Sequence, residues 1–219
     1  MKSNLFLFIS FIFMFSCSNI RDRKNENNNQ TENKNSNSSI DVFEKTKSVI
    51  WKEIKENEEE VSKNYICYET DSLISFEDTV QIMNNKYYID KQKKIIADFN
   101  KDGFDDIIVQ VYKEYGASGA MTMFYLFLTE SNNYEFVKSY DDYSLATENI
   151  KDKKLISGKF NFENITENKL QGSSTYYGEE DAHCCPTYYT EKEIYEYNAL
   201  TKKFEIKYQS ELKRNNLTN

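Results

Sequence analysis

The spacing of apolar residues changes along this chain and separates a leader, a polar stretch, a helix and a series of strands. Apolar side chains fill most of positions 5–15, and an Asn-rich polar stretch then continues to residue 40. From Asp41, apolar residues recur three and four positions apart, which is the period of an amphipathic helix. Beyond Lys63 the period is two, which indicates β-strands.

The helical segment is expected to begin at Asp41 and to bury one stripe against the rest of the protein. Glu44 lies three residues beyond Asp41, which is the spacing of a capping box. The apolar stripe comprises Val42, Phe43, Thr46, Val49, Ile50, Ile54 and Val61. Lysine and glutamate residues fill the opposite side, which we expect to face solvent.

The later segments predict antiparallel strands. Residues 79–83 and 87–90 flank a turn at residues 84–86 and are expected to form a hairpin. Residues 121–128 are apolar on both faces, which predicts a central strand that is covered on both sides. Two further stretches alternate, with apolar members at Ile156, Gly158, Phe160 and Phe162, and at Phe204, Ile206 and Tyr208. The predicted fold class is mainly β (α+β), with one antiparallel β domain over residues 41–214 and an N-terminal amphipathic helix.

The first 40 residues predict an export signal and a tether. One lysine precedes the apolar run, which is too short for a membrane span of about 20 residues. Residues 14–17 look like a lipobox, so residues 1–16 are interpreted as a lipoprotein signal peptide and Cys17 as the lipidated residue. A plain signal peptide with an incidental cysteine is the alternative. Residues 17–40 lack aromatic side chains and are expected to be a disordered tether.

The location and charge of the protein narrow its expected partners. A lipidated Cys17 predicts anchoring in the bacterial cell envelope, and Ser18 in place of an aspartate favours the outer membrane. The formal net charge of −8 argues against nucleic acid and is compatible with divalent cations. The chain has 17 tyrosines; tyrosine-rich sheets can bind glycans or proteins, although tyrosine also simply favours strands.

An acidic segment before the strand at residues 106–112 predicts a calcium loop. Oxygen-bearing side chains fall at alternate positions, and Gly103 permits the sharp turn that such a loop needs. The candidate ligands are Asp98, Asn100, Asp102, Phe104 through its backbone carbonyl, and Asp106 directly or through water. The expected cofactor is therefore a structural Ca²⁺. The alternative is an Asx-rich turn without a metal.

The remaining cysteines allow several arrangements. Thiols outside the cytoplasm tend to oxidise, and Cys67, Cys184 and Cys185 remain when Cys17 is lipidated. The adjacent Cys184 and Cys185 can form a vicinal disulfide, or Cys67 can pair with one of them, or all three can stay reduced. A zinc site at His183 is not favoured, because no second Cys/His pair follows at ligand spacing.

The order of these segments resembles a family of uncharacterised secreted bacterial lipoproteins. The segments that carry the resemblance are the D-x-N-x-D-G-x-x-D loop at 98–106, residues 116–119 and 123–126, the C-C-P-T segment at 184–187, and residues 195–197. The loop is similar to that of VCBS and FG-GAP repeats, where it precedes a strand of a propeller blade. The resemblance covers about half of the chain and implies an extracytoplasmic β fold. It implies no activity, and this chain departs from the family in its acidic residues 178–181 and its few glycines at 116–119.

The motifs favour a binding or structural role over catalysis. The sequence contains no Gly-x-Ser-x-Gly elbow, P-loop or His-Glu-x-x-His, and its single histidine leaves little room for triad chemistry. The expected function is a non-catalytic, membrane-anchored envelope lipoprotein that binds a glycan or a protein. One alternative is a glycan-directed carboxylate hydrolase, with candidates Glu179, Glu180 and Asp181 beside Tyr176 and Tyr177. The other is an inhibitor or immunity partner of another secreted protein.

Overall fold

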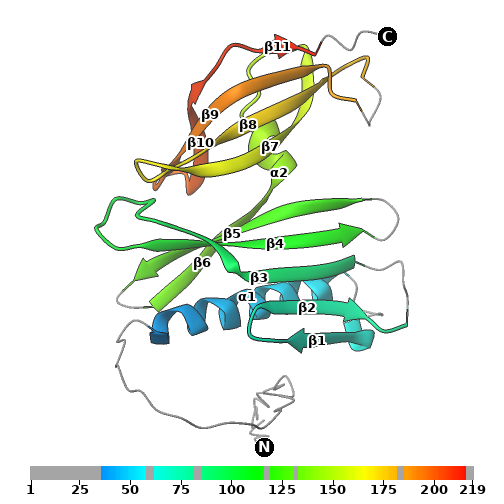
Figure 1. Cartoon of the computed structure of the whole chain (residues 1–219), viewed down its shortest axis with the longest axis vertical. Helices are drawn as coiled ribbons and strands as arrows, with labels where there is room; N and C mark the ends of the chain where they lie inside the picture. The colour runs from blue at the N-terminus through cyan, green and yellow to red at the C-terminus, as the bar shows by residue number, and fades with distance from the viewer. Residues whose placement is uncertain are drawn as a thin grey trace, which may run out of the picture.

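The computed structural model of the 219-residue chain describes residues 36–57, 62–80, 85–115, 119–130, 133–181 and 185–215. These residues form three layers: a helix, a six-stranded antiparallel sheet and a second, five-stranded sheet (Figure 1). The fold class predicted from the sequence, an antiparallel β protein with an N-terminal helix, is confirmed. The lipobox and most of the predicted tether lie outside the described residues.

Helix α1, Ser36–Asn57, covers one face of the first sheet. It begins at Ser36 rather than at Asp41, so the predicted capping box falls inside the helix and the end of the predicted tether is helical. Most of the apolar stripe is placed as expected, because Val42, Ile50 and Ile54 are fully buried. Val49 is half-buried, and Val61 lies outside the described residues. Within the described residues, no helix is both long enough and apolar enough to cross a bilayer.

The first sheet follows the chain, with each strand antiparallel to the next. A short 3₁₀ helix, Ser62–Asn64, precedes it. Its strands are β1 Tyr65–Glu69, β2 Leu73–Asp78, β3 Asn85–Ala97, β4 Asp106–Tyr115, β5 Ala120–Glu130 and β6 Asn133–Asp141. A hairpin joins β2 to β3, but not at the predicted positions. The first strand ends at Asp78, before the predicted strand at 79–83, and residues 85 and 86 of the predicted turn belong to β3; residues 81–84 lie outside the described part.

The second sheet lies on the other face of the first sheet and is reached through the short helix α2, Asp142–Thr147. Its strands are β7 Leu155–Thr166, β8 Lys169–Gly178, β9 Tyr188–Asn198, β10 Lys203–Gln209 and β11 Lys213–Arg214. They are ordered β10-β9-β8-β7, and β11 pairs with β9. The Asp141 side chain caps α2 by accepting from the Ser144 N–H, and Ser144 Oγ accepts from the Asp141 N–H in return.

Strand β5 separates two hydrophobic cores. Tyr125 and Phe127 belong to the cluster under α1, whereas Phe124 and Leu126 belong to the cluster between the two sheets, and all four are buried. The predicted central strand is therefore confirmed. Burying alternate residues on both faces explains why this stretch has no polar side of its own.

Two of the predicted apolar faces are interrupted where the strand pairing is irregular. Ile156 is 54% exposed and Tyr208 is 50% exposed, although both were expected on an apolar face with their neighbours. The pairing register shifts between Leu155 and Ser157 and again between Ile206 and Tyr208. A bulge inserts a residue and turns the following side chains to the other face, so strict alternation fails there.

The tight packing of β7 against Gly172 of β8 generates a first prediction. A Cβ atom on Gly172 would lie 2.1 Å from the backbone oxygen of Asn161 and 2.8 Å from the Phe160 ring. We expect Gly172→Ala to lower the free energy of unfolding by about 1–3 kcal/mol, because the strands must separate to admit the methyl group. Urea denaturation measures the change. Gly178→Ala is the matched control, since its Cβ would meet no atom closer than 3.2 Å, and equal losses in the two variants would refute the steric explanation.

Candidate functional site

The acidic loop at residues 98–106 joins β3 to β4 and is organised by its own side chains. Asp98 Oδ1 accepts a hydrogen bond from the Asp102 N–H at 3.0 Å, and Asp98 Oδ2 accepts from the Gly103 N–H at 3.1 Å. Asn100 Nδ2 donates to Asp102 Oδ2 at 2.8 Å, and Asp102 Oδ1 accepts from the Phe104 N–H at 2.9 Å. The first three oxygen-bearing side chains therefore converge within one turn.

Backbone conformation explains the glycine in this loop. Gly103 has φ of +91°, a region that residues with a Cβ rarely adopt, and Lys101 has φ of +63°.

The loop is also attached to the second sheet. Lys101 Nζ lies 2.5 Å from Glu196 Oε1 on β9, and the buried Phe99 ring packs edge-on against Phe204 of β10 with centroids 5.5 Å apart. The loop thus bridges both sheets at their junction.

Asp106 has a different role from the three residues before it. Its side chain is fully buried, and Oδ2 accepts from the N–H groups of Phe99 at 2.9 Å and Asn100 at 3.3 Å. Oδ1 accepts from the Thr129 N–H of β5 at 2.9 Å. Burial raises the pKa of Asp106, and these backbone bonds oppose that rise. Asp106 is therefore shown as the residue that ties the loop to β5, while its role as a metal ligand stays a prediction.

The donor chemistry of the loop fits a hard cation in part. Asp98, Asn100 and Asp102 offer carboxylate and amide oxygens on a partly exposed turn, which is the ligand type that Ca²⁺ prefers. Phe104 is 53% exposed, so its side chain leaves the turn accessible. Among the residues that the structure describes, no group of three or more His, Cys, Asp or Glu is arranged to hold a metal ion. Asp98, Asn100 and Asp102 are the exposed or half-exposed candidate ligands, and the Phe104 carbonyl and Asp106 also stay predicted ligands.

The cysteine positions fall in different parts of the fold. Cys67 lies on β1 of the first sheet and is half-buried. Cys185 is exposed and lies between β8 and β9 of the second sheet. Cys184 and His183 lie outside the described residues, and so does Cys17. The vicinal disulfide, the Cys67 pairing and the reduced form therefore all stay predictions.

The acids proposed for a hydrolase lie in the turn after β8. Glu179 and Glu180 are exposed there. Asp181 instead closes this turn, because its carboxylate accepts from the Gly178 N–H at 2.8 Å, the Thr187 N–H at 2.8 Å and the Thr187 hydroxyl. The Thr187 hydroxyl, followed by the backbone donors, lowers the pKa of Asp181. A glycosidase general acid needs the opposite shift, so Asp181 is suited to holding the turn.

A buried glutamate that the sequence reasoning missed lies in the second sheet. Glu193 on β9 is fully buried, and its carboxylate accepts from four hydroxyl groups and one amide. The donors are Ser174 at 2.5 Å, Tyr176 at 2.5 Å, Thr190 at 2.9 Å, Tyr195 at 2.8 Å and the Gln209 amide at 2.7 Å. Burial and the Glu193 charge raise the pKa of Tyr176 and of Tyr195.

Glu193 lies in step with Tyr195 and Tyr197, which are buried at every second position of β9. A glutamate adds no apolar signal to that alternation, so the sequence did not mark it as a core position. Thr190 joins the same side through a bulge, because Gly172 pairs with Glu193 and Ser174 pairs with Thr190, which leaves an extra residue in β9. The carboxylate is closed off by its own donors, which makes it a polar part of the core rather than a reactive group.

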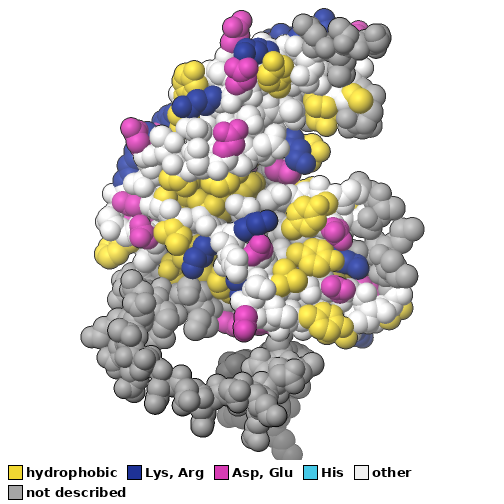
Figure 2. All heavy atoms as spheres, viewed as in Figure 1, with side chains coloured by type: hydrophobic (Ala, Val, Ile, Leu, Met, Phe, Trp, Pro, Cys, Tyr) yellow, Lys and Arg dark blue, Asp and Glu magenta, His cyan; other side chains and the backbone are white. Residues whose placement is uncertain are grey.

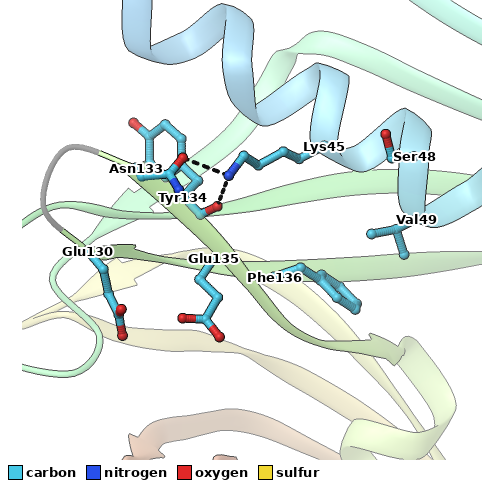
Figure 3. A pocket seen from close by; sticks show the side chains of 8 residues that line it. All are labelled: Lys45, Ser48, Val49, Glu130, Asn133, Tyr134, Glu135 and Phe136. Carbon is cyan, nitrogen blue, oxygen red and sulfur yellow. Dashed lines mark hydrogen bonds between the residues drawn. The ribbon is translucent and has the colours of Figure 1, made fainter. Parts of the chain in front are cut away.

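A groove runs between α1 and the edge strand β6 (Figure 3). It has a volume of about 620 Å³. Its lining residues are Lys45, Ser48, Val49, Glu130, Asn133, Tyr134, Glu135 and Phe136. Lys45 Nζ reaches from α1 to the Asn133 Oδ1 at 2.7 Å and to the backbone carbonyl of Tyr134. Lys45 thereby occupies part of the exposed edge of β6, whereas Glu130 and Glu135 point away from the helix.

Asp142 marks the junction between the two sheets. Asp142 is 3% exposed, and its Oδ2 accepts from the Thr122 N–H at 3.4 Å and lies 3.4 Å from Lys159 Nζ of β7. Oδ1 has no hydrogen-bond partner within the described part of the chain. Burial raises the pKa of Asp142, and Lys159 opposes the rise.

None of the family models, curated proteins or solved structures with which the chain was compared matches it. A functional assignment therefore depends on the geometry of the acidic loop, the Asp181 turn and the Glu193 cage.

The Asp106 contacts generate a stability prediction. Replacing Asp106 by Asn leaves one acceptor oxygen and turns an N–H₂ donor toward backbone N–H groups. We expect Asp106→Asn to lower the free energy of unfolding by about 1–3 kcal/mol, the cost of unsatisfied buried donors. Urea denaturation in the presence of a chelator measures it without any metal contribution. The exposed neighbour provides the control, since Asp105→Asn should change stability by less than about 0.5 kcal/mol. Equal stability of the two variants would show that Asp106 does not anchor the loop.

The raised pKa of Asp142 generates a pH prediction. Because the folded state holds the Asp142 proton more tightly than the unfolded chain, protonation of this group stabilises the fold as the pH falls from 7 toward 4. Asn cannot titrate, so the stability of wild type relative to Asp142→Asn should rise as the pH is lowered over that window. Chemical denaturation at several pH values measures this difference. Asp152→Asn serves as the control, because the pKa of Asp152 is lowered and should give no such rise; a flat difference for Asp142 would contradict the prediction.

Proposed function

We propose that this protein is a non-catalytic lipoprotein of the bacterial cell envelope, anchored through Cys17 and stabilised by Ca²⁺ at the acidic loop. In this proposal the β domain binds an envelope glycan or a protein, and the anchor lies in the outer membrane. Binding is favoured over catalysis because several acidic side chains already accept hydrogen bonds within the protein. Asp106, Asp181 and Glu193 each accept several hydrogen bonds from the protein itself.

Engaged carboxylates argue against the hydrolase alternative. A catalytic acid or nucleophile needs an oxygen that faces the substrate, and a general acid needs a raised pKa. Glu193 is enclosed by its donors, and the pKa of Asp181 is lowered. The inhibitor or immunity-partner alternative uses the same exposed surfaces as the binding function and differs only in the identity of the partner.

The calcium proposal rests on the three converging side chains of the loop. Asp98, Asn100 and Asp102 would hold the ion together with the Phe104 carbonyl and Asp106, directly or through water, and the ion would supply positive charge that neutralises the carboxylates. The loop is attached to β5 by Asp106 and to the second sheet by Lys101 and Phe99. Ordering this loop would therefore support the junction of the two sheets. A single loop of this type suggests an affinity in the extracellular range, about 10⁻⁴–10⁻³ M.

Thermal unfolding with and without calcium tests this proposal. At tenfold excess over the dissociation constant, the ion should add about 1.4 kcal/mol, which corresponds to a rise of roughly 3–6 °C in Tm for a protein of this size. Asp102→Ala should abolish the rise. Asp152→Ala is the matched control, because Asp152 also accepts from a backbone N–H two residues on but belongs to an exposed turn elsewhere, and it should keep the full rise.

Two outcomes would count against the calcium site. An unchanged Tm of the wild-type protein in 10 mM calcium would reduce the loop to an Asx turn. An equal rise in the wild type and in Asp102→Ala would place the binding elsewhere.

A further inference from the structure

Three tyrosines form a straight row across the first sheet. Tyr68 of β1 pairs with Ser75 of β2, Ser75 pairs with Tyr88 of β3, and Tyr88 pairs with Tyr112 of β4. Paired residues on neighbouring antiparallel strands project to the same face, about 4.8 Å apart for each strand. Tyr68, Tyr88 and Tyr112, called the tyrosine row below, therefore stand together with the small Ser75 between two of them.

The tyrosine row lies on the face opposite α1. The neighbours of these residues along the strands, among them Ile74, Tyr87, Ile89 and Val111, belong to the core beneath the helix. The second sheet covers only another part of this face, where Ile108 and Phe124 are buried. Tyr68 is 51% exposed and Tyr112 is 47% exposed. Figure 2 shows hydrophobic side chains gathered over β1–β4 on the surface beside the second sheet.

The charges beside the row are mainly negative. Glu77 and Glu114 lie in the adjacent row of the same face, with Lys86 between them, paired with Glu114 and 3.9 Å from Glu77. Burial raises the pKa of Tyr88, and the charges of Glu114 and Glu77 raise it further, because both carboxylates lie beside this ring. The π-faces of the rings are themselves electron-rich. This combination attracts cations and repels phosphate and nucleic acid.

We propose that the tyrosine row is a docking surface for an extended, arginine- or lysine-rich segment of a partner protein. Its cationic groups stack on the exposed rings of Tyr68 and Tyr112, and Glu77 and Glu114 neutralise them. A cationic segment fits this surface better than a second copy of this chain, because two molecules of net charge −8 repel each other. The inference specifies the partner class of the binding function proposed above and rests on that proposal.

Binding of short peptides to the purified protein tests the inference. The probes are an Arg/Gly peptide and a Glu/Gly peptide of equal length, measured by fluorescence anisotropy at physiological salt. The Arg/Gly peptide should bind and the Glu/Gly peptide should not. Replacing Tyr68 and Tyr112 by Ala together should weaken binding roughly five- to thirty-fold, the effect of losing two exposed cation–π contacts. Glu114→Gln should weaken it further and reduce its salt dependence.

The matched control is Tyr208→Ala, which removes an equally exposed tyrosine from β10 without a change of charge. This variant should bind the Arg/Gly peptide as the wild type does. An equal loss in both tyrosine variants, or no loss in either, would show only general attraction to an acidic protein and would overturn the proposal. The proposal would also be overturned in favour of a glycan by a different pair of results. These are no binding of the Arg/Gly peptide, and binding of a neutral oligosaccharide that is lost in the Tyr68→Ala/Tyr112→Ala variant. The calcium-dependent rise in Tm, measured on the same variants, separates failure of the row from failure of the calcium loop.

Discussion

The rest of the structure depends on the burial of both faces of the first sheet along β4 and β5. Tyr125 and Phe127 pack under α1, and Phe124 and Leu126 pack against the second sheet. Apolar burial is the main favourable term in folding, so a strand with two apolar faces must be enclosed on both sides. The same few residues of β5 therefore need both helix α1 and the second sheet to cover them. The second sheet covers only part of the first sheet. The remaining part of that face, which carries the tyrosine row, therefore stays exposed.

Buried acids act in this protein as structural anchors. Asp106 joins its loop to β5 through three backbone N–H groups, and Glu193 collects five neutral donors inside the second sheet. A buried carboxylate without a cation is costly unless hydrogen bonds to the charged form replace water. The donors here meet that requirement. At Glu193 these bonds occupy the lone-pair positions of both oxygens and leave none for a substrate, which is consistent with the non-catalytic proposal.

The fold and the candidate site were predictable to different depths. The period of apolar residues was sufficient for the helix stripe and for central strand β5, because both patterns follow from burial of one or two faces. The period was not sufficient at Ile156 and Tyr208. A bulge there turns a side chain to the other face of the sheet, and no pattern in the neighbouring sequence indicates the bulge. The start of α1 was also missed, because Ser and Asn at residues 36–39 carry no apolar period. The acidic loop was located correctly as a turn, whereas the engagement of Asp106 was not foreseen.

The sequence by itself determined the features whose hydrogen bonds close within a few residues. The turn at Asp98–Gly103 is of this kind, because Asp98 binds N–H groups only four and five positions away and Gly103 permits the required φ. Tertiary structure decided the features that join distant segments. Asp106 meets Thr129 and Tyr68 aligns with Tyr112 only when several strands pair in register. That register is set by packing against α1 and the second sheet, since a slip of one residue would expose every buried side chain of the strand.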